Sequence, residues 1–242
     1  MLRLIHGEIY RLLHKRSLFI YFGALALGYL VLAFIRSGGF SEDSIVNDAL
    51  SLFVLLPALV GGFLFAAIYT DDLNSRNLIS LVGSSTGKAT IIVAKFVLMA
   101  LFGVVLFGLA PLFHMGVYAL FGQTATIEMA RILFAVCLKY LLASLAFAAL
   151  SGIVVYGLQR TTFAIVTYLL FAFGVVGGLI SVALNMFAPS LVAHLVTGIT
   201  DRILLALIGG GTLLVPVVEY VIYLLVAVAL SYLVFSRKEM EF

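Results

Sequence analysis

Six stretches of this chain are almost free of charged residues, and each is long enough to cross a lipid bilayer as a helix. A crossing helix needs about 20 mostly apolar residues. Of the 242 residues, 64% are hydrophobic and only 10% are charged, whereas about a quarter of a soluble domain is charged. We therefore predict an all-α, polytopic membrane protein with six transmembrane helices. The stretches cover residues 18–35, 50–69, 91–120, 132–156, 163–187 and 213–235.

Three of these stretches carry features that shape a helix. The third is too long for a straight perpendicular crossing, so we expect it to tilt, to kink at Pro111 or to continue beyond the bilayer. Pro57 predicts a bend in the second stretch. In the fifth, Gly174 and Gly178 form a Gly-x-x-x-Gly face, which favours close approach of another helix.

The positions of lysine and arginine predict the orientation of the chain. An even number of crossings puts both termini on one side, and cytoplasmic loops carry an excess of basic residues. With cytoplasmic termini, ten of the 14 basic residues lie inside and four outside. Because this topology accounts for the net charge of +3, the charge does not indicate a nucleic-acid partner. The inner set is Arg3, Arg11, Lys15, Arg16, Arg76, Lys88, Lys95, Arg160, Arg237 and Lys238; the outer set is Arg36, Arg131, Lys139 and Arg202.

Residues 1–16 have the pattern of an amphipathic helix. Five apolar residues fall within an arc of about 100°, and the polar residues Arg3, Glu8, Arg11, His14 and Lys15 lie elsewhere. This helix is either a plain basic anchor on the membrane surface or an elbow helix that packs beside the first span. We expect five basic residues at the membrane surface: Arg11, Lys15, Arg16, Lys88 and Lys95.

Residues 188–212 differ from an ordinary loop. They contain two apolar runs, 191–196 and 203–208, which are too short to cross and are separated by Thr200-Asp201-Arg202. We predict two short helices in the outer leaflet, buried against protein so that their backbones are satisfied; the alternative is a loose interfacial loop. No segment between spans is large enough for an independent soluble domain. Residues 1–242 are therefore predicted to form a single transmembrane domain.

The most polar segment between spans is the loop at residues 70–90. It carries acids, bases, amides and hydroxyls between two apolar stretches, and its apolar residues are spaced for a short interfacial helix that ends near Gly83. A polar helix in this position favours contact with a cytosolic partner. It is not a phosphate-binding loop, because only three residues separate Gly83 from Gly87 and Ala89 follows Lys88. We therefore expect no ATP hydrolysis by this chain itself.

Three ionisable residues within the spans are candidates for a translocation path: His114, Lys139 and Glu219. Lys139 and Glu219 could pair with each other. For His114 we expect a hydrogen-bonded interior histidine, with substrate contact or proton binding as the alternative.

The chain offers no recognisable catalytic constellation. Its four histidines lack the spacing of metal ligands, and the single cysteine, Cys137, excludes a multi-cysteine site. No serine lies in a Gly-x-Ser-x-Gly setting. We predict that the chain is not an enzyme and has no catalytic, metal or cofactor site.

This layout resembles the membrane (permease) subunit of a type-2 ABC exporter. The amphipathic N-terminal helix, the six spans and the short outer helices all match, but the loop after the second span is the most specific element. In that family an acidic residue precedes a polar turn, a Thr/Ser-Lys/Arg pair and a helix, followed by a basic residue and a lysine in the next span. Here Asp stands where many relatives have Glu, and Gly87 precedes Lys88 where Ser is common. The matching positions are Asp71 or Asp72, Asn74, Ser75-Arg76, Asn77-Leu78-Ile79, Lys88 and Lys95.

The resemblance implies a function and a set of partners. A separate ABC ATP-binding subunit, which holds the ATP and magnesium, would dock on the coupling helix of the 70–90 loop, and a second permease subunit, identical or different, would complete the transporter in a bacterial plasma membrane. Export of an amphipathic peptide or a lipophilic compound by alternating access is implied, as in antimicrobial-peptide export or bacteriocin self-protection. The alternatives are the substrate-binding membrane subunit of a vitamin importer and a membrane-embedded enzyme. The implied docking residues are Asp71, Asp72, Asn74, Arg76, Asn77, Leu78 and Ile79.

Overall fold

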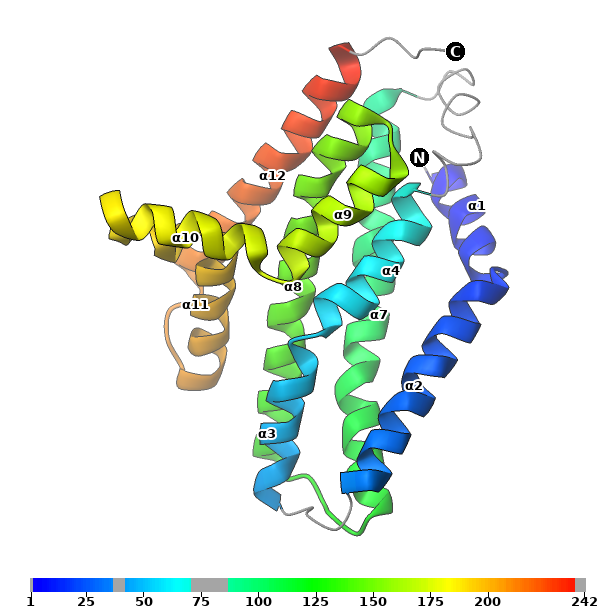
Figure 1. The fold of residues 1–242 in the computed structure, drawn as a ribbon, viewed down its shortest axis with the longest axis vertical. Coiled ribbons are helices and arrows are strands. Elements are labelled where there is room, and N and C mark those ends of the chain that lie inside the picture. The colour runs from blue at the N-terminus through cyan, green and yellow to red at the C-terminus, as the bar shows by residue number, and fades with distance from the viewer. Residues whose placement is uncertain (1, 37–41, 71–86, 238–242) are drawn as a thin grey trace.

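A computed structural model of the protein describes residues 2–36, 42–70 and 87–237. All the elements in these ranges are helices, which confirms the all-α class (Figure 1). The centre of the predicted coupling loop, residues 71–86, lies outside the described residues.

Four helices of the described chain are long and apolar enough to cross a membrane without interruption: α2 (Arg16–Arg36), α7 (Lys88–Leu120), α8 (Ile127–Leu158) and α12 (Leu214–Arg237). Two further crossings arise only if bent helix pairs are each counted as one span. Ile45–Phe53 joins Pro57–Thr70 with a bend of 40°, and Thr161–Ala172 joins Val175–Phe187 with a bend of 57°. The chain therefore has the build of a membrane protein with four to six crossings.

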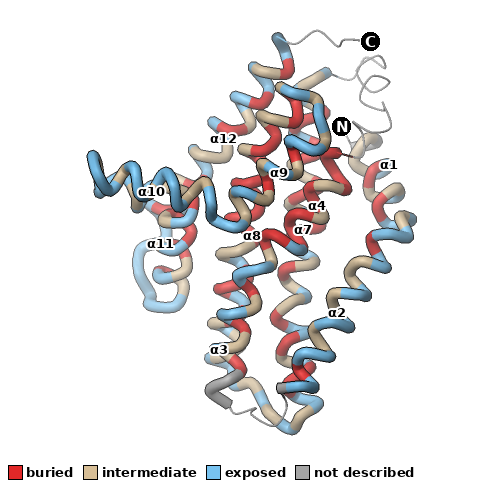
Figure 2. Tube along the Cα trace, viewed as in Figure 1, coloured by how far each residue is buried: buried red, intermediate tan, exposed pale blue. Residues whose placement is uncertain are grey.

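Helices α7 and α8 form the centre of the bundle. They contain 33 and 32 residues, which corresponds to about 50 Å each and exceeds the roughly 30 Å hydrocarbon core. Helix α7 continues through Pro111 without a break, so its extra length extends the helix and does not divide it. Buried residues concentrate along α4, α7 and α8 (Figure 2).

The second predicted span is bent, as Pro57 indicates. Helix α3 (Glu42–Phe53) ends before Pro57 and the chain continues as η2 (Pro57–Gly61), α4 (Gly62–Phe65) and η3 (Ala66–Thr70), in which η2 and η3 are π-helical turns. A proline cannot donate a helical hydrogen bond and restricts the residue before it, so the regular helix ends there. The carbonyls of η2 gain extra donors, because Tyr168 Oη donates to Pro57 O at 3.0 Å and Tyr21 Oη to Leu59 O at 2.9 Å.

The fifth predicted span is divided into α9 (Thr161–Ala172) and α10 (Val175–Phe187). Gly174 adopts a left-handed conformation with φ of +74°, which glycine takes up at little cost, and α10 projects sideways from the bundle (Figure 1). No residue of α10 is buried. The expected Gly-x-x-x-Gly packing face does not form within the described chain, because a Cβ at Gly174 or Gly178 would meet nothing within 4 Å.

Two short helical segments precede the last span, but their boundary differs from the prediction. The first is the 3-10 helix η4 (Pro189–His194), and the second is α11 (Val196–Gly209), which ends at the left-handed Gly210. The polar triplet Thr200-Asp201-Arg202, expected to separate the two, lies inside α11. It is tolerated there because its charged side chains find partners on other elements, as described below.

The N-terminal segment forms helix α1 (Leu2–Leu13). Its apolar stripe faces the bundle, since Leu12 is fully buried and Ile5 and Ile9 pack against the core. Glu8, which the periodicity places on the polar face, is buried as well. Helix α1 therefore makes a charged contact with the bundle in addition to an apolar one.

Candidate functional site

Both ends of the polar loop are anchored at one end of the bundle, which we call the loop end. Thr70, the last described residue before the loop, is buried in the bundle, and its Oγ1 donates within η3 itself, to Ala66 O at 2.8 Å. After the loop, Lys88 begins α7, and its Nζ donates to the carbonyl oxygen of Phe235 in α12 at 2.9 Å. The loop thus connects η3 directly to a point where α7 and α12 are joined.

Three charged side chains at the loop end form what we call the root cluster: Glu8, Arg11 and Lys95. Arg11 Nη2 lies 2.6 Å from Glu8 Oε2, and Lys95 Nζ lies 3.2 Å from the same oxygen. Arg11 Nη2 also donates to Ala67 O in η3 at 3.4 Å. The root cluster therefore connects α1, α7 and the end of the second predicted span.

Lys95 was expected at the membrane surface, and the structure places it inside the protein instead. Its side chain is 3% exposed. A buried ammonium needs a nearby anion and hydrogen-bond acceptors to replace water, and the carboxylate of Glu8 provides the anion. Of the other basic residues expected at the surface, Arg16 is exposed, while Arg11, Lys15 and Lys88 are partly buried.

Glu8 was not among the residues that the sequence singled out for function. The other charged residues on the polar face of its helix are basic, so the sequence pattern did not indicate that Glu8 pairs with a buried side chain. A usable signal was Lys95 itself, because a lysine in an apolar span is expected to pair with an acid. The docking residues Asp71, Asp72, Asn74, Arg76, Asn77, Leu78 and Ile79 lie outside the described part of the chain.

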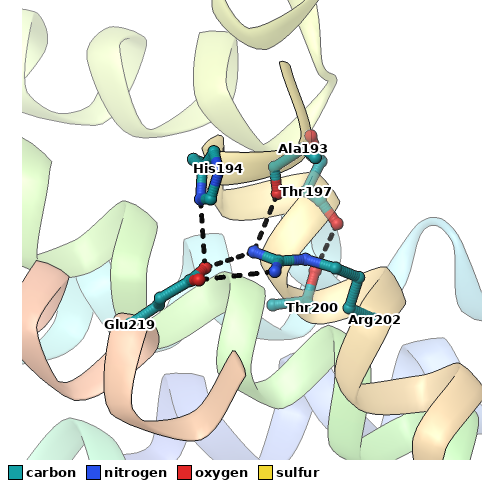
Figure 3. Close-up of polar contacts among 6 residues, drawn as sticks. All are labelled: Ala193, His194, Thr197, Thr200, Arg202 and Glu219. Carbon is teal, nitrogen blue, oxygen red and sulfur yellow. Dashed lines mark hydrogen bonds and ion pairs between the residues drawn. The ribbon is translucent and has the colours of Figure 1, made fainter. Parts of the chain in front are cut away.

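A second group of charges surrounds α11, and we call it the α11 cluster: Lys139, His194, Asp201, Arg202 and Glu219. The Arg202 guanidinium contacts the Glu219 carboxylate, and Nη2 of Arg202 also donates to the Ala193 carbonyl at 3.0 Å (Figure 3). His194 Nδ1 lies 3.3 Å from Glu219 Oε2. On the other side of α11, Lys139 Nζ lies 2.5 Å from Asp201 Oδ1.

This arrangement corrects the alternative in which Lys139 and Glu219 pair with each other. Each pairs instead with one of two consecutive residues of α11, Asp201 and Arg202. Consecutive residues on a helix point about 100° apart, so α11 can contact α8 on one side and α12 on the other. The α11 cluster thus fastens α11 between these two spans.

His114 is a hydrogen-bonded interior histidine, as expected. It is fully buried; its Nδ1 contacts the hydroxyl of Tyr29 in α2, and its Nε2 lies 2.8 Å from the carbonyl oxygen of Ile45 in α3. One helical turn further along α7, Tyr118 Oη donates to Asp48 Oδ2 at 2.6 Å. Among the described residues, no hydrogen bond or ion pair joins His114 to the α11 cluster, so the three path candidates do not form one polar site.

The described chain contains a small hollow between packed helices, and its possible metal ligands do not gather into one centre. The hollow lies between η3, α7, α8 and α12, with Tyr69, Tyr156 and Ser231 in its lining. Its volume of about 10 Å³ is about that needed for one water molecule. Within the described residues, no group of three or more His, Cys, Asp or Glu side chains could hold a metal ion. The two charged clusters and the His114 contacts are therefore its candidate functional features.

Comparison with known proteins adds no relative to this picture. No protein-family model, no curated protein and no solved structure matches the chain.

Proposed function

We propose that this chain is the transmembrane subunit of an ATP-driven ABC transporter that exports an amphipathic peptide or a lipophilic compound by alternating access. A separate ATP-binding subunit grips the 70–90 loop from the cytosol and supplies the energy. The observation that carries the proposal is the anchoring of both ends of this polar loop in the helix bundle.

This anchoring suits a loop that transmits force. A push on the loop reaches the second span through Thr70, which is buried, and reaches α7 and α12 through Lys88 and the Phe235 carbonyl. The root cluster joins α1 to the second span and to α7 through Glu8, Arg11 and Lys95. Rigid-body movement of packed helices is the usual way in which closure of a partner subunit is passed on.

The apolar surface of the bundle favours a lipophilic or amphipathic cargo. The charged side chains described in the α11 cluster are occupied by each other, so they offer little to a highly charged substrate. In this proposal the chain lies in a bacterial plasma membrane, crosses it several times and has both termini in the cytoplasm, with Arg16 at the inner surface. A second copy or a related permease completes the pathway, for which His114, Lys139 and Glu219 remain candidates.

Affinity purification tests the proposal. The tagged chain, extracted from its native membrane in a mild detergent, should recover an ABC-type ATP-binding subunit. Asp72→Arg and Arg76→Glu should each abolish this recovery, because each reverses a charge in the proposed docking segment. Arg160→Glu is the matched control, since Arg160 lies in another loop predicted to be cytoplasmic, and it should leave recovery unchanged.

The outcome also separates the alternatives. Recovery of the ATP-binding subunit by both loop variants would contradict docking at the 70–90 loop. A preparation that holds a small ligand with high affinity would favour the vitamin-importer subunit. A preparation that turns over a lipid-soluble substrate without any partner would favour an enzyme.

A further inference from the structure

Helix α2 is the least buried of the four uninterrupted spans. Only 11% of its most apolar segment is buried within the chain, compared with 50% for α7 and 67% for α8. In Figure 1 it runs along the edge of the bundle, continuing from α1. Its outward face carries large apolar side chains, such as Ile20 and Phe34, as expected for contact with lipid.

Aromatic side chains and their hydroxyls attach α2 to the bundle. Tyr21 stacks on Phe63 with ring centroids 4.1 Å apart and donates to Leu59 O at 2.9 Å. Tyr29 lies edge-on to Phe113, with centroids 5.6 Å apart, and its hydroxyl contacts His114 Nδ1. These contacts tie α2 to the second predicted span at one level and to α7 at another.

The attachment of α12, which also exposes much of its surface, is of a different kind. Helix α12 approaches the backbone of α8 closely: a Cβ at Gly152 would lie 3.4 Å from Ser231 Oγ, and one at Gly157 would lie 3.2 Å from Val234. The glycines of α2, Gly23 and Gly28, have nothing within 4 Å of a Cβ. Close backbone packing therefore fixes α12, whereas side-chain contacts that can be broken singly hold α2.

The hydrogen-bond pattern at His114 defines what α2 covers. The carbonyl of Ile45 can only accept, so Nε2 of His114 carries the proton and donates to it at 2.8 Å. Nδ1 is then an acceptor, and the Tyr29 hydroxyl donates to it. If α2 moves away, a buried imidazole acceptor is exposed beside the ring of Phe53.

We propose that α2 is a lateral gate, which opens when the Tyr29–His114 and Tyr21–Leu59 hydrogen bonds break. The open gate admits from the bilayer a lipophilic molecule that carries a hydrogen-bond donor, such as a hydroxyl, and this donor replaces Tyr29 at Nδ1 of His114. The use of the opening for substrate entry rests on the proposed transport function, but the opening itself does not. An unsatisfied acceptor in an apolar site is unfavourable, so closed and donor-occupied arrangements are favoured over intermediate ones.

Electron–electron distance measurements test the movement. Spin labels at Leu27→Cys in α2 and Val104→Cys in α7, both exposed positions, are placed in a Cys137→Ala background, and the protein is reconstituted in lipid nanodiscs. Tyr29→Phe keeps the ring and removes the hydroxyl, so the ratio of long to short distances should rise roughly fivefold, as for the loss of one hydrogen bond. Tyr232→Phe, which deletes an exposed hydroxyl in α12, is the control and should change nothing.

A second measurement uses the absence of tryptophan from the chain. Phe63→Trp places a single fluorophore behind α2, and brominated phosphatidylcholine vesicles should quench it more strongly when Tyr21→Phe or Tyr29→Phe is also present. In the same vesicles, dodecanol should increase quenching of the Phe63→Trp protein, whereas dodecyl methyl ether, which has no donor, should not.

Two results would overturn parts of this proposal. Identical distance distributions and identical quenching in the parent, Tyr21→Phe and Tyr29→Phe would exclude the gate. Equal effects of the alcohol and the ether would exclude His114 as the acceptor. Both assays run without an ATP-binding subunit, so failure of the gate is distinct from failure of the proposed function, which the affinity purification measures.

Discussion

Replacing Gly61 with alanine tests whether the bend in the second predicted span is packed as the structure shows. The added Cβ would lie 2.2 Å from Tyr168 Oη and 2.9 Å from Ser144 Oγ, whereas real Cβ contacts stay beyond 3.0 Å. Tyr168 is fully buried, and its hydroxyl donates to Pro57 O at 3.0 Å. To relieve the overlap, this hydroxyl must move from 2.2 Å to at least 3.0 Å from the new Cβ, a shift of about 0.8 Å. The shift weakens its hydrogen bond to Pro57 O.

Overpacking of a core costs about 1–3 kcal/mol, and a buried hydrogen bond lost without replacement costs a similar amount. We therefore expect Gly61→Ala to lower the free energy of unfolding by about 2–4 kcal/mol, measured by titration with sodium dodecyl sulfate in mixed micelles and followed by circular dichroism. Tyr168→Phe alone should lower it by about 1 kcal/mol. The double variant should lose less than the sum of the two, because the clashing atom is gone.

A matched control is available in α7. Gly108 has nothing within 4 Å of an added Cβ, so Gly108→Ala should leave the stability unchanged or raise it by up to about 1 kcal/mol through helix propensity. Equal stabilities of Gly61→Ala and Gly108→Ala would show that Gly61 is not packed against Tyr168. Simple additivity of Gly61→Ala and Tyr168→Phe would show the same.

Three further predictions concern the charged groups and the loop. Glu8→Gln should lower the free energy of unfolding by about 3 kcal/mol, because it removes the carboxylate between two cations, and adding Lys95→Met should restore most of this loss. The same detergent titration measures both variants, and an unchanged midpoint for Glu8→Gln would argue against the root cluster. Glu219→Gln should speed backbone amide exchange in η4 and α11, because Glu219 joins these two elements to α12. Hydrogen exchange followed by mass spectrometry measures this, and unaltered exchange would show that the α11 cluster does not fasten α11. A single cysteine at Ser85, in a Cys137→Ala background, should react with a membrane-impermeant maleimide only after cells are permeabilised; labelling of intact cells would invert the predicted orientation.

The helical class and the uninterrupted spans could be predicted because apolar length alone determines them. The bend at Pro57 was also predictable, because proline restricts the backbone at its own position whatever the tertiary structure. The break at Gly174 was not. Its sequence context reads as one apolar stretch, and a glycine in such a stretch serves helix packing as readily as a left-handed turn.

The pairing of charges depends on tertiary structure and was largely out of reach. The sequence predicts a surface position for Lys95, because it does not show that α1 places Glu8 beside it. A pairing of Lys139 with Glu219 was one alternative that the sequence left open, but each pairs instead with a charge of opposite sign on α11. His114 was predictable as an interior histidine, since a lone histidine in an apolar span needs hydrogen bonds, although its partners Tyr29 and Ile45 were not.

The central claim is that this chain couples to an ATP-binding subunit through its polar loop, and ATP hydrolysis by the affinity-purified complex tests it most directly. The complex recovered with the unaltered chain should hydrolyse ATP and be inhibited by vanadate. The equivalent preparation from the chain with both Asp72→Arg and Arg76→Glu should contain the membrane subunit at the same yield and lack this activity. Equal vanadate-sensitive hydrolysis in the two preparations, or none with the unaltered chain, would contradict the account.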